Sequence, residues 1–301
     1  MSGKNVLIQF PECFGNGVQR IEYPAGELQV RLDPATAAQV ETATLVITQA
    51  RIKNSTDLVS LLLYEDAVVQ LAPDARHILR LPYLPYARAD RRFVYGDCAG
   101  LDVFLDILAV STFDEIQVLD LHNPDAAIKE PKLVINVSPV NLIRKSVAIF
   151  SDEVTILFPD AGAAKRYGED LGGIQYLYAT KKRHPATGIF EGFDVPDPAA
   201  FESDSVLIVD DICDGGGTFI GIAEELQRKG FTGRLGLYVT HGIFSKGTGN
   251  GIYSGLRRYF SDFFTTNSVR DMFEDNFTQW DAFEALVRAD RTQQRIDAKS
   301  V

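Results

Sequence analysis

A buried strand that runs directly into acids, glycines and a helix constrains the fold of this chain more than any other segment. The apolar run Val206-Leu207-Ile208-Val209 is followed by Asp210-Asp211-Ile212-Cys213-Asp214, by three consecutive glycines and by Thr218. Apolar residues then recur at the i, i+3, i+4 and i+7 spacing of a helix with one buried face, at Phe219, Ile222, Ala223 and Leu226. A strand, a tight turn and an amphipathic helix in this order predict an α/β fold.

Strand-like and helical segments alternate twice along the chain. In the first half, strands are expected at 45–48, 78–82 and 116–120, with helices at 57–70 and 101–111 between them. In the second half, strands are expected at 155–158, 175–178, 205–209 and 235–240. One helix is expected at 161–171, and another follows the strand 205–209 and ends at 229. This pattern predicts two α/β domains, 1–142 and 143–301, each a largely parallel sheet flanked by helices. The residues from Asn267 onward are expected to form a helix with a polar tail.

Composition excludes several classes of function. The chain carries 41 acidic and 30 basic residues, a formal net charge of −11, which argues against a protein that binds nucleic acid through a wide basic face. No apolar run approaches the roughly 18 residues of a membrane span, and the N-terminus has no signal-peptide core. Cys13, Cys98 and Cys213 are odd in number and far apart, so a reduced, cytoplasmic location is expected.

The glycine-rich loop has the properties of a phosphate site. Consecutive glycines allow several backbone N–H groups to converge, and a helix N-terminus adds the positive end of its dipole. The spacing is neither GxGxxG nor GxxxxGK[ST], which excludes the dinucleotide and P-loop motifs. Because Asp210 and Asp211 would repel a phosphate, either sugar hydroxyls donate to them or a divalent cation intervenes. An acid pair that only caps the helix is the structural alternative.

The segment from Asp210 to Thr218 resembles the motif that binds 5-phosphoribosyl 1-diphosphate (PRPP) in type I phosphoribosyltransferases and in ribose-phosphate pyrophosphokinases. The resemblance implies that Asp210 and Asp211 face the ribose 2- and 3-hydroxyls. It also implies that the rest of the motif wraps the 5-phosphate, through Asp214, Gly215, Gly216, Gly217 and Thr218. The motif alone does not separate the two families.

Three segments resemble ATP and metal motifs of the pyrophosphokinases. The stretch at 84–92 resembles a PYARQDR loop, which implies that Arg88 and Asp90 contact ATP. Asp120-Leu121-His122 resembles a DLH motif, which implies that His122 lies at the Mg²⁺–triphosphate. The stretch at 159–166 resembles PDxGGxxR, in which Asp160 holds Mg²⁺ or its water shell, and the same aspartate can also cap the helix that follows.

Further segments separate a pyrophosphokinase from a transferase. Thr180-Lys181-Lys182-Arg183 resembles the K-x-R flexible loop, absent from ordinary phosphoribosyltransferases, and implies that Lys181 and Arg183 are catalytic. Tyr23-Pro24-Ala25-Gly26-Glu27 resembles an adenine-binding FxNGE segment, with Tyr23 as the aromatic platform and Glu27 as a hydrogen-bond partner. Adenine is often received from a neighbouring subunit in this family, so a homo-oligomer, at least a dimer, is expected. The THGIFS segment at 240–245 is interpreted as architectural and adjacent to the site.

The resemblance as a whole implies two tandem type I phosphoribosyltransferase-like domains, an N-terminal ATP side and a C-terminal ribose 5-phosphate side, with the active site at their junction. The implied reaction transfers the β,γ-diphosphoryl group of Mg-ATP to the C1 hydroxyl of ribose 5-phosphate and gives PRPP and AMP, with Mg²⁺ as cofactor. Two alternatives stay open. One is a phosphoribosyltransferase that uses PRPP. The other is a non-catalytic binding or regulatory subunit, prompted by Ala25, Ala89 and Thr180, where the family has Asn, Gln and His.

Overall fold

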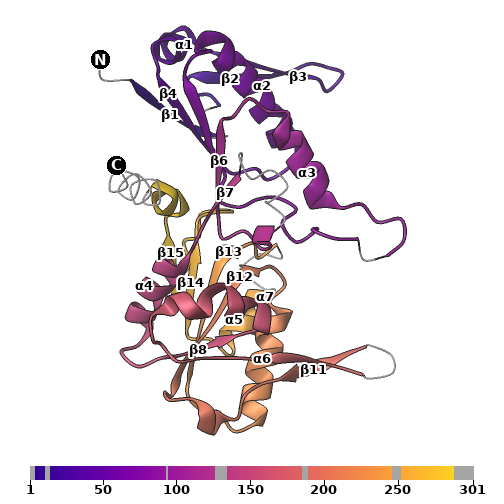
Figure 1. Ribbon diagram of the computed structural model, residues 1–301, viewed down its shortest axis with the longest axis vertical. Coiled ribbons are helices and arrows are strands. Elements are labelled where there is room, and N and C mark those ends of the chain that lie inside the picture. Colours follow the sequence, from indigo (N-terminus) through magenta and orange to yellow (C-terminus); the bar gives the residue numbers. More distant parts are fainter. Residues whose placement is uncertain are drawn as a thin grey trace. The chain divides into compact units, whose positions relative to one another are not determined.

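The computed structural model of the chain contains two compact units. It describes residues 4–10, 14–92, 94–125, 134–184, 189–245 and 252–287; Cys13 lies outside these ranges. One unit comprises Met1–Val137 with Ala282–Val301, and the other comprises Ser138–Asp281 (Figure 1). The sequence-based boundary at 142/143 falls inside the helix Val140–Phe150. The units instead separate just before this helix, and residues 282–301 group with the first unit.

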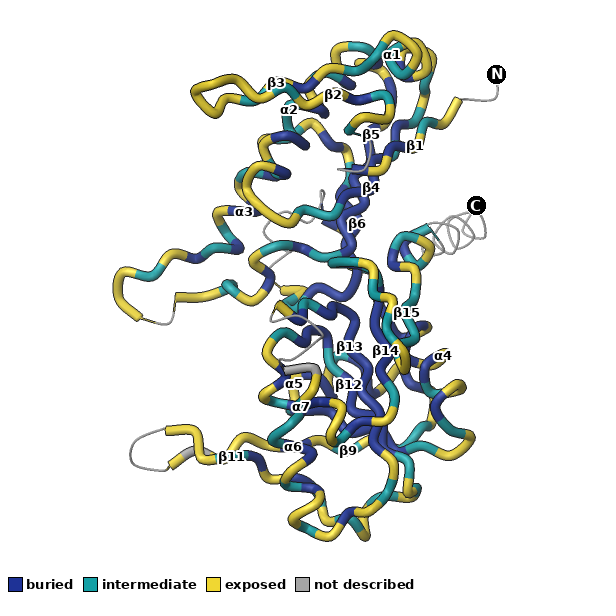
Figure 2. Tube along the Cα trace, turned by 180° about the vertical axis from the view of Figure 1, so that it is seen from behind, coloured by how far each residue is buried: buried dark blue, intermediate teal, exposed yellow. Residues whose placement is uncertain are grey.

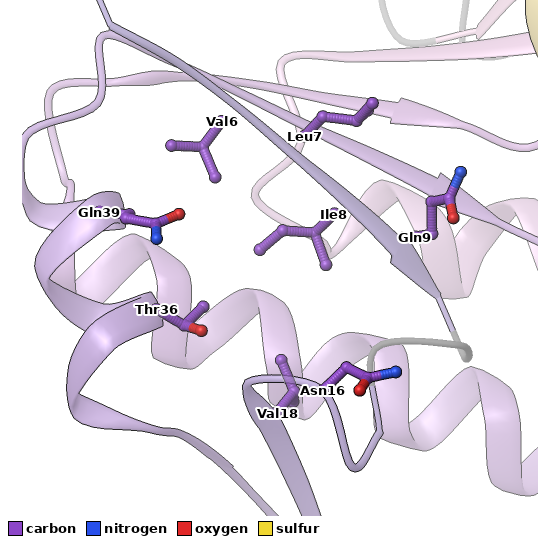
Figure 3. A pocket seen from close by; sticks show the side chains of 8 residues that line it. All are labelled: Val6, Leu7, Ile8, Gln9, Asn16, Val18, Thr36 and Gln39. Atoms are coloured by element: carbon purple, nitrogen blue, oxygen red, sulfur yellow. The ribbon is translucent and has the colours of Figure 1, made fainter.

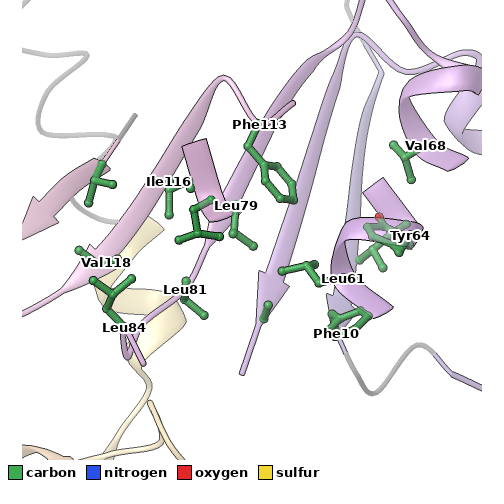
Figure 4. Close-up of a cluster of buried hydrophobic side chains, with 14 of the residues drawn as sticks. Phe10, Leu61, Tyr64, Val68, Leu79, Leu81, Leu84, Phe113, Ile116 and Val118 are labelled. Carbon is green, nitrogen blue, oxygen red and sulfur yellow. The ribbon is translucent and has the colours of Figure 1, made fainter. Parts of the chain in front are cut away.

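The first unit is built on a five-stranded parallel sheet in the order β1-β4-β5-β6-β7. Its strands are β1 (Asn5–Phe10), β4 (Leu45–Ala50), β5 (Arg76–Arg80), β6 (Glu115–Leu119) and β7 (Val134–Val137). Its helices are α1 (Pro34–Glu41), α2 (Ser55–Leu71) and α3 (Gly100–Ala109), and β2 (Val18–Glu22) and β3 (Leu28–Leu32) form an antiparallel hairpin. The core packs α2 and α3 against the sheet, and in it Leu61 and Tyr64 of α2 pack with Phe10 of β1 (Figure 4).

The second unit contains a six-stranded parallel sheet in the order β15-β14-β13-β12-β8-β9. Its strands are β8 (Thr155–Phe158), β9 (Tyr176–Tyr178), β12 (Ser205–Cys213), β13 (Arg234–Gly242), β14 (Asp262–Thr266) and β15 (Phe277–Trp280). Its helices are α4 (Val140–Phe150), α5 (Ala161–Tyr167), α6 (Gly217–Arg228) and α7 (Ile252–Arg257), with 3-10 turns η2 (Gly168–Leu171) and η3 (Pro198–Ala200). A separate antiparallel hairpin joins β10 (Thr180–Arg183) to β11 (Phe190–Asp194). The two central strands, β12 and β13, are buried along almost their whole length (Figure 2).

The observed elements confirm the alternation predicted from the sequence and correct it in several places. β12 continues to Cys213, so both carboxylates after Val209 belong to the strand and the turn itself is only three residues long. The helix expected from Asn267 onward is wrong at its start, because Phe277–Trp280 pairs with β14 as an edge strand. The hairpins β2–β3 and β10–β11 lie where no strand was expected. Within the described part of the chain, no helix is both long and apolar enough to cross a membrane.

Glu65, on the buried face of α2, is an ionisable group enclosed in the first unit. Its exposed fraction is 3%, and Thr112 Oγ1 donates a hydrogen bond of 2.7 Å to Glu65 Oε1. Burial raises the pKa of Glu65 to about 7 against the opposing effect of the Thr112 hydrogen bonds, and the charges of Asp114 and Asp66 raise it further. Folding therefore favours the protonated carboxyl.

Replacing Glu65 by the neutral, isosteric Gln should therefore stabilise the chain at high pH only. The wild-type free energy of unfolding should fall as the pH rises from about 4.5 to about 7, because the buried side chain must then ionise. Chemical denaturation near pH 8 should find Glu65→Gln more stable by about 3 kcal/mol, and near pH 4 the difference should vanish. Glu41→Gln, at an exposed position of α1, is the control. An equal effect of Glu65→Gln at both pH values would contradict the assignment.

Candidate active site

The carboxyl end of β12 brings two aspartates and one arginine together. Arg166, on α5, directs its Nη2 atom to Asp211 Oδ1 at 3.1 Å and to Asp210 Oδ1 at 3.3 Å. The Arg166 and Asp210 side chains are each 19% exposed and that of Asp211 only 3%. The Arg166 guanidinium also lies 4.9 Å from the centre of the Tyr167 ring. The chain itself therefore supplies a cation beside the acid pair. The sequence had suggested only sugar hydroxyls or a divalent cation as partners of these two carboxylates.

Arg166 is the residue of this site that sequence reasoning missed. The residue was visible as the last position of the PDAGAAKR stretch, but its spacing from Asp210 along the chain gave no sign of contact. Burial raises the pKa of Asp210 well above its ordinary value, and the neighbouring Asp211 carboxylate raises it further. The Arg166 charge acts in the opposite direction and favours the ionised form of Asp210.

The turn between β12 and α6 leaves the first turn of a helix open. Gly216 has φ +70°, in the left-handed region, and its carbonyl accepts the N–H of Ile220 at 3.0 Å as a first bond of the helix. Among the described residues, no side chain caps this helix end. Gly217 is exposed, and a Cβ atom built there would meet nothing within 4 Å. Amide donors and open space at a helix N-terminus suit an anion such as a phosphate.

The segment after β13 supports the turn from the other side. The Ser245 N–H donates to Asp214 Oδ1 at 2.9 Å, and the Ile243 N–H donates to the Cys213 carbonyl at 2.9 Å. His241 is 2% exposed, and its Nδ1 lies 2.8 Å from Ser268 Oγ. These contacts agree with an architectural role for the THGIFS segment.

Asp160 and Lys181 meet at the start of α5. Asp160 caps the helix, because its Oδ1 accepts the Ala163 N–H at 3.1 Å, while its Oδ2 lies 3.4 Å from Lys181 Nζ. The Asp160 side chain remains 47% exposed and that of Lys181 41% exposed. The capping role and an accessible carboxylate oxygen therefore coexist in one residue. Because Arg166 belongs to the same short helix, α5 links this pair to the acid pair of β12.

The K-x-R segment is a strand rather than a loop. Thr180–Arg183 pairs antiparallel with β11, and Lys181 is the direct partner of Phe193. The register shifts between Lys182 and Arg183. The backbone of Arg183 belongs to β10, but its side chain lies outside the described parts, so its catalytic role stays a prediction.

In the first unit, a hydrogen bond joins two of the predicted ATP segments. Asn123 Nδ2 donates to Asp90 Oδ2 at 2.8 Å, which ties the 85–92 stretch to the residues after β6. His122, next to Asn123, is half-buried, and Arg88 is exposed. Tyr23 and Glu27 lie apart from this pair at the turn of the β2–β3 hairpin, where both are exposed and the Tyr23 N–H donates to the Glu27 carbonyl at 2.8 Å.

Backbone strain gathers in the predicted motifs. In the described part of the chain, the non-glycine residues with positive φ are Tyr86 (+63°), Asp120 (+49°), Phe244 (+41°) and Asn276 (+70°). The first three belong to the PYARADR, DLH and THGIFS segments, respectively. Left-handed conformations at such residues cost free energy and concentrate at functional sites. The placement of Tyr86 and Asp120 therefore supports a functional interpretation of the PYARADR and DLH segments.

A cavity elsewhere in the first unit contains none of the predicted site residues. It has a volume of about 400 Å³ and lies between β1 and α1 (Figure 3). Its lining residues are Val6, Leu7, Ile8, Gln9, Asn16, Val18, Thr36 and Gln39. The described residues also contain no group of three or more His, Cys, Asp or Glu side chains that could hold a metal ion by themselves.

Known proteins that this chain resembles in sequence share one name. The chain is 32% identical over 231 residues to a ribose-phosphate pyrophosphokinase of Pyrococcus abyssi, a match that covers 75% of this chain and 76% of the relative. It is 26% identical over 264 residues to a protein of the same name from Methanopyrus kandleri, with 85% of each chain covered. The fold resembles a crystal structure of phosphoribosylpyrophosphate synthetase from Mycobacterium smegmatis, with a TM-score of 0.74, 19% identity, and 98% and 99% of the two chains covered. This likeness confirms the predicted α/β fold class. No family model matches the chain.

The ion pair between Arg166 and the two aspartates can be tested without any substrate. Arg166→Gln leaves two neighbouring carboxylates without their cation, and the free energy of unfolding near pH 8 should fall by about 3 kcal/mol. Because Arg166 lowers the pKa of Asp210, its removal raises that pKa further. The loss of stability should therefore shrink as the pH falls and Asp210 takes up a proton. Denaturant titrations between pH 5 and pH 9 measure this.

The double variant Arg166→Gln/Asp210→Asn is the matched control for this prediction. It removes one of the two unpaired charges, and it should recover part of the lost stability near pH 8. A loss that is independent of pH, or a double variant that is no more stable than Arg166→Gln, would contradict the electrostatic account.

Proposed function

Because this chain belongs to the ribose-phosphate pyrophosphokinase family, we propose that it transfers the β,γ-diphosphoryl group of Mg-ATP to the C1 hydroxyl of ribose 5-phosphate. The family membership confirms the resemblance drawn from the motifs and makes the chain an enzyme. In the proposed step, the C1 oxygen forms a bond to the β-phosphorus of ATP, and the bond from that phosphorus to the α,β-bridging oxygen breaks. AMP leaves, the C1 hydroxyl gives up its proton, and PRPP is formed.

One observation carries this proposal: an open helix end, a pair of carboxylates and a lysine occur together in the second unit, connected through α5. The 5-phosphate binds at the segment 214–218, which comprises the turn and the start of α6, where amides of the first helical turn supply donors. Asp210 and Asp211 accept hydrogen bonds from the two ribose hydroxyls. The Arg166 charge supports this role, because only an ionised carboxylate offers all its oxygens as acceptors.

The nucleotide contacts are assigned to residues of the first unit. Arg88 and Asp90 engage the ATP phosphates and ribose, and the bond from Asn123 to Asp90 supports a fixed position for that segment. Tyr23 provides a ring for adenine, and Glu27 a hydrogen-bond acceptor, at the exposed turn of the β2–β3 hairpin. We infer that this hairpin serves a neighbouring subunit, so the enzyme works as a homo-oligomer, at least a dimer.

The residues fit a role for Mg²⁺. This ion is usually held by one or two carboxylates together with substrate phosphates and water, not by an all-protein cage. A half-exposed Asp160 suits that mode, and so does the lack of a three-ligand cluster among the described residues. Asp160 and His122 are the residues that would hold Mg²⁺ or its bound water. When bound, the ion neutralises charge on the phosphate oxygens.

Lys181 and Arg183 act on the transferred group. Diphosphoryl transfer depends on positioning and charge neutralisation more than on covalent chemistry. Lys181 offers a compact charge and Arg183 a planar fork of donors for the oxygens around the β-phosphorus. The 3.4 Å contact between Lys181 and Asp160 supports a lysine that reaches the start of α5.

A direct assay tests the reaction and the role of Lys181. Incubation of the full chain with ATP, Mg²⁺ and ribose 5-phosphate should release AMP in equal amount to PRPP. Lys181→Ala should lower kcat about 10²–10³-fold, since a donor to the transition state is lost. Lys182→Ala is the matched control, because neighbouring side chains on a strand point to opposite faces.

Two outcomes would contradict the proposal. Full turnover by Lys181→Ala would remove the catalytic assignment. Sugar-phosphate binding without turnover would favour a regulatory subunit, and base-dependent release of diphosphate without ATP would favour a phosphoribosyltransferase.

A further inference from the structure

The hairpin that carries Lys181 is seated on helix α6. Strand β11 packs against α6, and the ribbon runs past that helix in Figure 1. Phe193 of β11 is the buried residue of this contact, with an exposed fraction of 7%. Its ring packs edge to face with that of Phe190, with 5.2 Å between the ring centres. An aromatic side chain of the β10–β11 hairpin thus packs against helix α6 and holds the hairpin in place.

Gly221 provides the position on α6 that receives the ring. A Cβ atom built on Gly221 would lie 2.7 Å from Phe193 Cε2 and 2.9 Å from Phe193 Cδ2. Both distances are shorter than ordinary Cβ contacts in proteins, so the ring occupies the space of the missing side chain. Glycine inside a helix costs about 1 kcal/mol relative to alanine. The close approach of Phe193 explains why a glycine occupies this helical position despite its cost in stability.

A polar contact adds to the aromatic one at the far end of the same helix. Lys229, the C-terminal cap of α6, directs Nζ to Asp194 Oδ1 at 3.0 Å and also donates to the Val195 carbonyl. The Asp194 side chain is 51% exposed, so this ion pair contributes little to stability. Phe193 is therefore the main anchor, and Asp194 limits how far the ribbon can pivot around it.

The strand register connects this anchor to the catalytic lysine. Lys181 is the cross-strand partner of Phe193, and directly opposed residues of an antiparallel pair place their side chains on the same face. The face of the ribbon that contacts α6 therefore also carries Lys181. At its N-terminus the same helix begins with the turn proposed for the sugar phosphate. One rigid helix thus relates the ammonium group to the phosphate site.

We propose that Phe193 and Gly221 are positioning residues that set the distance between Lys181 and the sugar-phosphate turn. The inference rests on the proposed diphosphoryl transfer. A ring held against the helix backbone fixes the base of the ribbon, and the position of Lys181 follows from the register. Small displacements of a catalytic group are costly, because a shift of about 1 Å can lower a rate about a hundredfold. Neither residue touches substrate.

The test is a pair of complementary substitutions. Gly221→Ala pushes the Phe193 ring away from α6, so kcat should fall about tenfold or more while the KM for ribose 5-phosphate stays within about twofold. Phe193→Val removes both clashing ring atoms, so the double variant Gly221→Ala/Phe193→Val should recover much of the kcat lost in Gly221→Ala. Such non-additivity is expected only of residues in contact. Gly255→Ala, in α7, is the control, because its Cβ would meet only the mobile end of Ile220 at 3.1 Å.

Hydrogen exchange provides a readout that does not depend on turnover. In Gly221→Ala, amides of 180–183 and 190–194 should exchange faster, while those of β12 keep the wild-type rate. A Gly221→Ala protein with unchanged kcat and unchanged exchange would overturn the inference, as would equal changes in kcat and in the KM for ribose 5-phosphate. If the wild-type chain forms no AMP, the proposed function fails. Faster hairpin exchange would then still support the anchor, and unchanged exchange would refute it.

Discussion

The carboxyl end of β12 is the constraint on which the site depends. The strand is buried on both sides in the middle of a parallel sheet, so its course is fixed by neighbours β8 and β13. Its last residues must leave the sheet where α6 begins, and the left-handed Gly216 makes that change of direction possible. Two carboxylates and an uncapped helix end are therefore held within one turn of each other. Two negative charges in the same place require compensation, which Arg166 supplies.

Charge compensation explains why the acid pair can exist before any ligand binds. Two carboxylates beside each other in a partly buried site favour the uptake of a proton, and the pKa of Asp210 is raised accordingly. Arg166 opposes that effect from a helix that also begins with Asp160, the partner of Lys181. A short helix thus connects the residues proposed to bind the sugar with the residue proposed to act in the transfer. The fastening of the β10–β11 hairpin to α6 adds a second mechanical link between the same two functions.

The sequence predicted those features that depend on local pattern. Buried strands, amphipathic helices and the glycine turn follow from periodicity, and the structure bears them out at β4, β8, β12 and α6. Features that depend on contacts distant in sequence were missed. Arg166 contacts residues 44 and 45 positions away. The polar segment at 180–183 has no alternation of apolar residues, so its pairing with β11 gave no signal. The edge strand β15 pairs with β14, and its Phe277 stacks on Phe263 at 5.0 Å, a contact between residues distant in sequence.

The central claim is that a sugar phosphate binds at the end of β12, with its phosphate on the first turn of α6 and its diol on the aspartate pair. A crystal structure of the full chain with ribose 5-phosphate tests it most directly. The account predicts density for the phosphate within hydrogen-bond distance of the amides at 215–218, and the 2- and 3-hydroxyls on Asp210 and Asp211. A ligand bound elsewhere, with the Arg166 pair undisturbed and the helix end empty, would contradict the account.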